Sequence, residues 1–254
     1  MGRTDGALTV IWIKICGITR VVDAHAAAEA GVDAVGVNFY PASKRFVSPE
    51  TAQAIADALR PKLDVVGVFV NSPAQDVVDI IKRIQLTAVQ FHGDETAESI
   101  VAVRKACPNI AIVRAFRLRK NKIADVLHSI RELQQSGAAL AAVLVDAFVP
   151  DEYGGTGHMI AADLFGEFRQ CLSSFAGASD DSAKWLSSAT PPRVILAGGL
   201  TPETVAKAAN VARPWGVDTA SGVESTPGIK SSEQIRQFVK AVRTTASSGP
   251  PDRL

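Results

Sequence analysis

Short runs of consecutive apolar residues alternate along the chain with longer segments in which apolar positions recur every three or four residues. Short, uninterrupted apolar runs are typical of parallel strands that are covered on both faces, and the longer segments are typical of amphipathic helices. The runs predict eight strands, over residues 10–16, 34–39, 64–70, 88–91, 110–115, 141–145, 193–197 and 215–218. A predicted helix follows each strand, and the last helix covers residues 232–242.

Local signals mark where some of the helices begin. Ser48 is followed by Pro49 and Glu50, which supply a capping hydroxyl, a fixed backbone angle and a charge that the helix dipole favours. The Ser-Pro pair at residues 72–73 is predicted to open the third helix in the same way. The fourth helix is expected from Asp94 onward.

The strict alternation of strands and helices predicts one (β/α)8 barrel domain spanning residues 1–254. The alternative is an open doubly wound sheet, but that fold favours a G-x-G-x-x-G turn after its first strand, which this chain lacks. We expect loose ends at residues 1–9 and 247–254. A surface insertion is expected over residues 173–192, after the sixth helix and on the barrel face opposite to active sites.

Composition narrows the classes of function. Apolar residues make up 47% and charged residues 21%, the balance of a folded globular protein. The formal net charge of +1 leaves no basic excess to neutralise a run of nucleic-acid phosphates. The longest uncharged apolar stretch, residues 138–145, is too short to span a bilayer. The first nine residues are polar and do not form a signal peptide. We therefore expect a cytoplasmic location. The three cysteines lack C-x-x-C spacing, so neither a disulfide framework nor a zinc site is expected.

Polar residues and glycines gather after the carboxyl ends of the predicted strands, where (β/α)8 enzymes carry their sites. Gly198 and Gly199 follow the seventh strand, and Ser221 and Gly222 follow the eighth. The fold frequently binds phosphate at these two strand ends through backbone N–H groups, and glycine lets the backbone approach the anion closely. These four residues therefore predict a phosphate site and a small phosphorylated substrate.

Cys16 and Asp146 end the first and sixth strands, on opposite sides of the predicted barrel mouth. A thiolate accepts a proton and a protonated carboxyl gives one, so the pair suits acid–base chemistry. The alternative for Asp146 is a turn or helix-capping residue. Lys14 shares a strand face with Cys16, so its ammonium is expected inside the barrel, where it either lowers the pKa of the thiol or pairs with a barrel carboxylate.

Three further polar residues near the mouth are candidates for the site. Arg45, in a basic pair after the second strand, either grips a substrate carboxylate or is a solvated loop charge. His92, at the end of the fourth strand, is a candidate substrate contact, and Gln90 is a candidate supporting residue. A single histidine without other ligands at useful spacing does not predict a metal site.

An ordered set of short motifs between Lys14 and Val242 resembles the phosphoribosylanthranilate isomerase family of tryptophan biosynthesis. The motifs are KICGIT at 14–19, SKR at 43–45, VGVFV at 66–70, QFHGD at 90–94, VD at 145–146, GGTG at 154–157, LAGGL at 196–200 and SGVE at 221–224. The chain departs from the family at Ala220, where a serine is usual, and in the 173–192 insertion.

The resemblance implies an Amadori rearrangement of N-(5-phosphoribosyl)anthranilate to 1-(2-carboxyphenylamino)-1-deoxyribulose 5-phosphate. By this resemblance Asp146 is the general acid that protonates the ring oxygen, and Cys16 is the general base that removes the C2′ proton. Arg45 is implied to face the anthranilate carboxylate, and Asp218 to contact polar groups of the substrate. Residues 154–157 are implied to form part of a mobile lid. This chemistry needs no metal or redox cofactor.

Two other interpretations stay open. One is a bifunctional isomerase that also accepts the aminoimidazole substrate of the histidine pathway, although such enzymes usually use two aspartates where this chain has Cys16 and Asp146. The other is a barrel that binds a sugar phosphate without turning it over. The sequence is compatible with a monomer or a homodimer.

Overall fold

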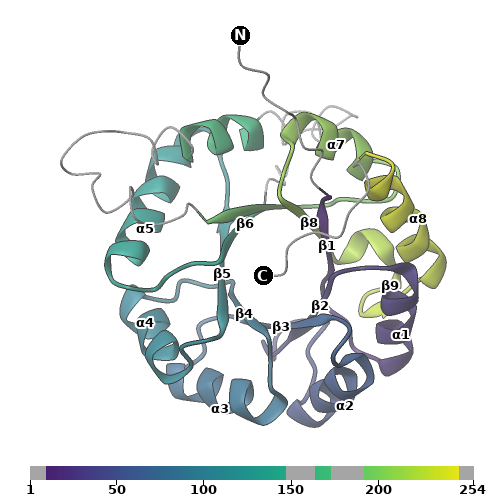
Figure 1. The fold of residues 1–254 in the computed structure, drawn as a ribbon, viewed down its shortest axis with the longest axis horizontal. Helices are drawn as coiled ribbons and strands as arrows, with labels where there is room; N and C mark the ends of the chain where they lie inside the picture. Colours follow the sequence, from purple (N-terminus) through teal and green to yellow (C-terminus); the bar gives the residue numbers. More distant parts are fainter. Residues whose placement is uncertain (1–9, 147–163, 173–191, 246–254) are drawn as a thin grey trace.

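A closed barrel of parallel strands forms the centre of the molecule. The structure, a computed structural model, describes residues 10–146, 164–172 and 192–245. In this part of the chain eight parallel strands pair in sequence order, and the eighth pairs with the first (Figure 1). The strands are β1 (Trp12–Ile15), β2 (Ala34–Asn38), β3 (Asp64–Phe69), β4 (Ala88–Phe91), β5 (Ala111–Arg117), β6 (Ala142–Asp146), β7 (Arg193–Ala197) and β8 (Gly216–Thr219). The predicted (β/α)8 fold is confirmed.

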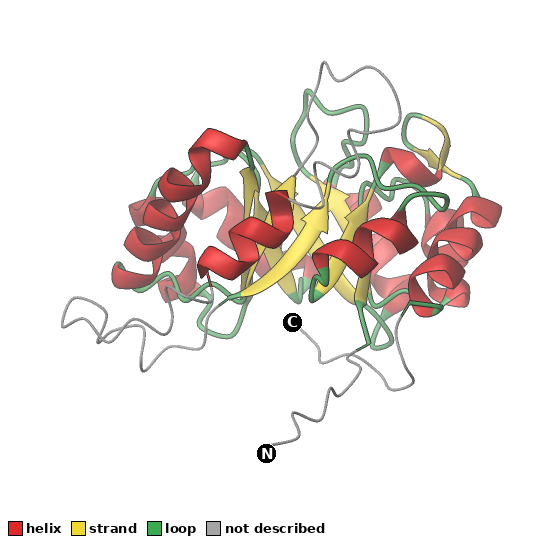
Figure 2. Cartoon of the chain, turned by 90° about the horizontal axis from the view of Figure 1, so that it is seen from above, coloured by secondary structure: helices red, strands yellow, loops and turns green. Residues whose placement is uncertain are grey.

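Helices surround the barrel as an outer ring (Figures 1 and 2). They are α1 (Val21–Ala30), α2 (Pro49–Leu59), α3 (Ala74–Ile84), α4 (Ala97–Ala106), α5 (Ile123–Gln135), α7 (Val205–Ala212) and α8 (Ser232–Arg243), with a further helix over residues 164–172. Two short 3-10 helices, η1 (Lys120–Lys122) and η3 (Ser221–Val223), follow β5 and β8. No helix within the described ranges is long and apolar enough to cross a membrane.

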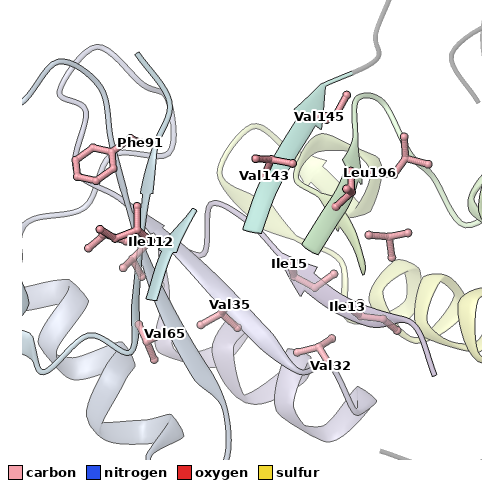
Figure 3. Packing of buried hydrophobic residues seen from close by; sticks show 14 of the residues in the cluster. Ile13, Ile15, Val32, Val35, Val65, Phe91, Ile112, Val143, Val145 and Leu196 are labelled. Carbon is pink, nitrogen blue, oxygen red and sulfur yellow. The ribbon is translucent and has the colours of Figure 1, made fainter. Parts of the chain in front are cut away.

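Side chains that alternate along the strands build two separate hydrophobic layers. Ile13 and Ile15 of β1 face outward and join the larger cluster between strands and helices, part of which is shown in Figure 3. Trp12 points into the barrel and belongs to a second cluster with inward residues of the other strands. Lys14 lies between Ile13 and Ile15 in sequence and is buried, as strand alternation predicts for a residue inside the barrel.

The predicted helix starts have mixed outcomes. Ser48 caps α2, and its hydroxyl accepts a hydrogen bond of 3.3 Å from the backbone N–H of Thr51. The predicted cap at Ser72 is wrong, because α3 begins after Pro73 and has no side-chain cap. The fourth helix begins after Thr96 rather than at Asp94, because the preceding residues form a hydrogen-bonded loop.

A short antiparallel hairpin between β8 and α8 is absent from the sequence-based expectations. It consists of β9 (Glu224–Thr226) and β10 (Ile229–Lys230), joined by a turn in which Gly228 has a φ of 85°. The hairpin contacts the loop after β1, where the hydroxyl of Thr19 donates a 2.5 Å hydrogen bond to the carbonyl of Gly228. Its two strands are too short to leave a periodic pattern.

Several predicted features lie outside the described residues. These are the ends at 1–9 and 247–254, the insertion over 173–192 apart from Pro192, and the loop at 154–157. The prediction of a single domain with these boundaries therefore stays a prediction.

Candidate active site

The candidate residues meet at the mouth of the barrel, at the carboxyl ends of the strands. Cys16 directly follows β1, and Asp146 is the last residue of β6. In the closed order of the strands, β7 and β8 separate these two on one side. His92, after β4, interacts electrostatically with Asp146 and also with Lys14, so these three side chains lie in the same region of the barrel mouth.

The position of Cys16 is fixed by its neighbours on both sides. Its backbone N–H donates to the carbonyl of Thr219 at 2.8 Å, and Gly36 lies against its side chain. A Cβ added at Gly36 would lie 2.9 Å from the Cys16 Sγ and 3.2 Å from its Cα. Glycine at this position therefore makes room for the thiol.

Burial dominates the ionisation of Cys16. It raises the pKa of the thiol above its ordinary value, although the ammonium groups of Lys14 and Lys230 oppose the increase. The sequence-based expectation had the correct sign for the effect of Lys14. The pKa is nevertheless raised, because desolvation penalises a thiolate more than the nearby cations stabilise it. In the resting protein Cys16 is therefore a thiol at neutral pH.

Lys14 forms a buried ion pair inside the barrel. Its Nζ lies 2.8 Å from Oδ1 of Asp218, its direct neighbour in the β1–β8 register, and the two side chains are 1% and 9% exposed. Burial alone would lower the pKa of Lys14, but attraction to Asp218 and Cys16 raises it, so the ammonium stays charged. Both sequence-based alternatives for Lys14 therefore apply: it pairs with a carboxylate and acts on the thiol.

Gln90 and His92 form a second pair of polar residues, in which only Gln90 is fully buried. Gln90 is fully buried, and its Nε2 lies 2.7 Å from Nδ1 of His92. When the amide donates, Nδ1 accepts and the ring proton sits on Nε2. Burial lowers the pKa of His92, and Lys14 lowers it further, which keeps the imidazole neutral. The predicted supporting role of Gln90 thus corresponds to a direct contact with His92.

Arg45 is partly exposed and forms an ion pair. Its Nε and Nη2 donate to Oε1 and Oε2 of Glu224, each at 2.7 Å. Its aliphatic part lies over Gly17, where an added Cβ would be 2.3 Å from the Arg45 Cδ. The alternative of an unpaired loop charge does not hold, because the guanidinium is held in a two-point ion pair with Glu224.

The two predicted phosphate segments lie side by side. Gly198 and Gly199 have φ angles of 102° and 61°, which favour glycine. A Cβ added at Gly222 would lie 1.8 Å from the carbonyl oxygen of Leu200, so the η3 segment packs directly on the loop after β7. Gly199 and Ser221 are exposed.

Two buried carboxylates near the mouth have no role in the sequence-based expectations. One is Glu224. The other is Glu95, which accepts hydrogen bonds from the backbone N–H groups of Asn71 and Gly93 and pairs with Arg114 at 2.5 Å. An acidic residue just before a helix resembles an ordinary capping residue in sequence, so only the contact between loops reveals it. Among the described residues no group of histidine, cysteine and carboxylate side chains is arranged to hold a metal ion.

Fold and site together define a (β/α)8-barrel enzyme with ionisable groups at the carboxyl ends of its strands. Residues 13–241 match the family model of N-(5'phosphoribosyl)anthranilate (PRA) isomerase. A relative from Chlorobium phaeobacteroides (strain BS1), an N-(5'-phosphoribosyl)anthranilate isomerase, is 41% identical over 92% of this chain and 97% of its own. The chain belongs to the phosphoribosylanthranilate isomerase family, which are aldose–ketose isomerases of tryptophan biosynthesis.

Solved structures agree with this assignment. Phosphoribosyl anthranilate isomerase from Thermotoga maritima aligns with a TM-score of 0.74 and 34% identity, covering 92% of this chain and 100% of that one. A second isomerase structure holds reduced 1-(o-carboxyphenylamino)-1-deoxyribulose 5-phosphate and aligns with a TM-score of 0.71 and 31% identity, with coverage of 92% and 100%.

Proposed function

We propose that this isomerase performs the Amadori rearrangement with Asp146 as general acid and Cys16 as general base. Asp146 donates a proton to the furanose ring oxygen of N-(5-phosphoribosyl)anthranilate, the ring C–O bond breaks, and an iminium cation forms. The Cys16 thiol gives up its own proton to water, and the thiolate then takes the proton from C2′ of the sugar. The resulting enolamine ketonises to 1-(2-carboxyphenylamino)-1-deoxyribulose 5-phosphate. The proposal rests above all on the placement of these two groups at one barrel mouth.

The positive charge of the iminium intermediate favours ionisation of the Cys16 thiol. The buried thiol resists ionisation in the resting site. Ring opening places a positive charge on the nitrogen next to the carbons that react, and a nearby cation favours the thiolate. The base thus becomes active at the step that needs it, with Lys14 contributing a fixed positive charge throughout.

The order of the strands supports one orientation of the substrate. The phosphate segments, Gly198–Gly199 and Ser221–Gly222, follow β7 and β8, whereas Arg45 follows β2. Cys16 directly follows β1, which pairs with β8 on one side and β2 on the other. A substrate with phosphate at one end and anthranilate at the other therefore places its sugar carbons over Cys16.

The remaining polar residues fit the periphery of this arrangement. In the proposal the outward edge of Arg45 binds the anthranilate carboxylate, and Nε2–H of His92 donates a hydrogen bond to the substrate. Asp218 acts mainly by holding Lys14, since its carboxylate is already engaged by that ammonium.

The test is turnover of substrate generated in situ, followed by the loss of anthranilate fluorescence. Cys16→Ala and Asp146→Asn are each expected to lower kcat by ~10²–10⁴, the usual contribution of a positioned base or acid. KM should change much less, because neither group is assigned to ground-state binding. Cys107→Ala is the matched control and should keep wild-type kcat. Near-wild-type turnover in either site variant would exclude that residue from its role.

A further inference from the structure

A buried carboxylate is shared between two cations beside the candidate base. Glu224 accepts two hydrogen bonds from Arg45, both at 2.7 Å, and its Oε1 also accepts one from Nζ of Lys230 at 2.8 Å. The side chains of Glu224 and Lys230 are 4% and 0% exposed, whereas that of Arg45 is 26% exposed. Both oxygens of Glu224 are therefore engaged within the protein, and neither is left to serve as a ligand for substrate.

The contact with Glu224 uses one particular edge of Arg45. A guanidinium presents two edges suited to a carboxylate: a side edge with Nε and one terminal nitrogen, and an end edge with both terminal nitrogens. Glu224 occupies the side edge, through Nε and Nη2. The end edge, which includes Nη1, is the one that can still grip a second carboxylate in two-point fashion.

We propose that Glu224 is a positioning residue that fixes Arg45 so that the end edge of its guanidinium meets the carboxylate of the anthranilate ring. This inference rests on the proposed substrate role of Arg45 and adds the element that sets its geometry. Gly17 also contributes, because only a residue without a side chain leaves room for the Arg45 methylenes.

Lys230 anchors Glu224 to the other end of the site. Besides Glu224, its Nζ donates to the carbonyl of Ala220 at 2.8 Å, directly before the predicted phosphate-binding Ser221. Its backbone N–H donates to Asp23 at 3.2 Å, which ties the β9–β10 hairpin to α1. One buried ammonium thus links the predicted phosphate end of the site to the arginine at the anthranilate end.

The internal ion pairs do not neutralise this cluster of charges. The trio of Arg45, Glu224 and Lys230 carries a net charge of +1, so the positive field needed for an anionic ring substituent survives the internal ion pairs. Glutamine at position 224 would keep the size of the side chain but face the Nη2 donors of Arg45 with an NH2 donor. Glu224→Gln therefore breaks the two-point contact with little change in volume.

The test separates carboxylate recognition from everything else that holds the ligand. Two probes are titrated by calorimetry: the reduced product analogue with its carboxyphenyl ring, and the same compound with a plain phenyl ring. In the wild type the phenyl analogue should bind ~10–100-fold more weakly, the worth of a charge-assisted contact. In Arg45→Ala this ratio should fall to about 1, because its partner is gone.

In Glu224→Gln the ratio is expected to fall by about 10-fold or to unity, while the Kd of the phenyl analogue stays within about twofold of wild type. A purely structural role would weaken both probes alike and leave the ratio unchanged. Glu233→Gln is the matched control, because Glu233 forms an exposed ion pair with Arg236, and it should leave the ratio at the wild-type value. If Glu224→Gln is too unstable to purify, Glu224→Gln/Lys230→Met removes one charge of each sign and should show the same loss.

The outcomes distinguish the inference from the function on which it rests. Suppose that the ratio of the two Kd values, phenyl to carboxyphenyl analogue, stays at the wild-type value in Glu224→Gln or the double variant but falls to about 1 in Arg45→Ala. This result would overturn the positioning role and leave the role of Arg45 intact. A wild-type ratio in Arg45→Ala would overturn both. A ratio lost in Glu224→Gln and in Arg45→Ala, and kept in Glu233→Gln, supports the proposal.

Discussion

Adding a single methyl group at Gly36 should disable the site without touching any ionisable residue. The new Cβ would lie 2.9 Å from the Cys16 Sγ, about 0.5 Å closer than the 3.4 Å at which ordinary contacts begin. The backbone cannot absorb the shift, because the N–H of Cys16 is bonded to Thr219 and the carbonyl of Gly36 accepts from Ile18 at 2.9 Å. The thiol must therefore rotate or move.

The size of the effect follows from this displacement. A misplacement of about 1 Å in a reacting group costs ~10²-fold, so a shift of about half that size predicts a fall in kcat of about 10–100-fold. Overpacking a filled site costs about 1–3 kcal/mol, reduced by up to ~1 kcal/mol because alanine restricts the unfolded chain. At about 2–4 °C per kcal/mol, the expected loss in Tm for Gly36→Ala is a few degrees.

The assay combines turnover and thermal unfolding. Gly166→Ala is the matched control, since a Cβ at that helical position meets nothing within 4 Å, and it should keep kcat and gain up to ~1 kcal/mol. Combining Gly36→Ala with Cys16→Ala removes the sulfur and should recover part of the lost stability. A Gly36→Ala protein with kcat within about twofold of wild type would refute the argument that this contact fixes the thiol.

Two further predictions concern the charge next to the base and the phosphate end of the site. Lys14→Met removes a cation and leaves Asp218 buried alone, so the pKa of Cys16 should rise further and its alkylation by iodoacetamide, placed by mass spectrometry, should shift to higher pH. The shift should be smaller in Lys14→Met/Asp218→Asn, and an unchanged profile in Lys14→Met would remove the lysine from the tuning of the thiol. Gly222→Ala would put a Cβ 1.8 Å from the carbonyl oxygen of Leu200. The substitution should therefore raise KM by about tenfold or more and weaken inhibition by inorganic phosphate. Unaltered phosphate inhibition would argue against this segment as the anion site.

The barrel itself follows from local pattern. Parallel strands covered on both faces must be apolar along their whole length, so their positions can be predicted without knowing their partners. Strand alternation also placed Lys14 inside the barrel with Cys16. Strand alternation cannot predict the pKa of the Cys16 thiol, because that pKa depends on how burial and the charge of Lys14 compare. Burial has the larger effect, although only the lysine is visible in the sequence.

The contacts that aim the side chains were beyond prediction because they join distant parts of the chain. Arg45 and Glu224 are 179 residues apart, and no periodicity connects them. The start of α4 was misplaced for a related reason: Glu95 bonds to backbone groups of the loops after β3 and β4 and delays the helix. Helix propensity describes the conformation that a segment favours in isolation, whereas the start of α4 is set by contacts with other loops.

The β9–β10 hairpin gives the site an unusual dependence on the order of synthesis. Arg45 and Gly17 are synthesised before the groups that fix the arginine, because Glu224 lies 179 residues after Arg45 and Lys230 follows it. Contacts of such long range form late in folding, because a large loop must close before they can contribute. A nascent chain that has paired only its first strands therefore lacks the carboxylate partner of Arg45. Competence to recognise the substrate should arrive with barrel closure, as one of the final events of folding.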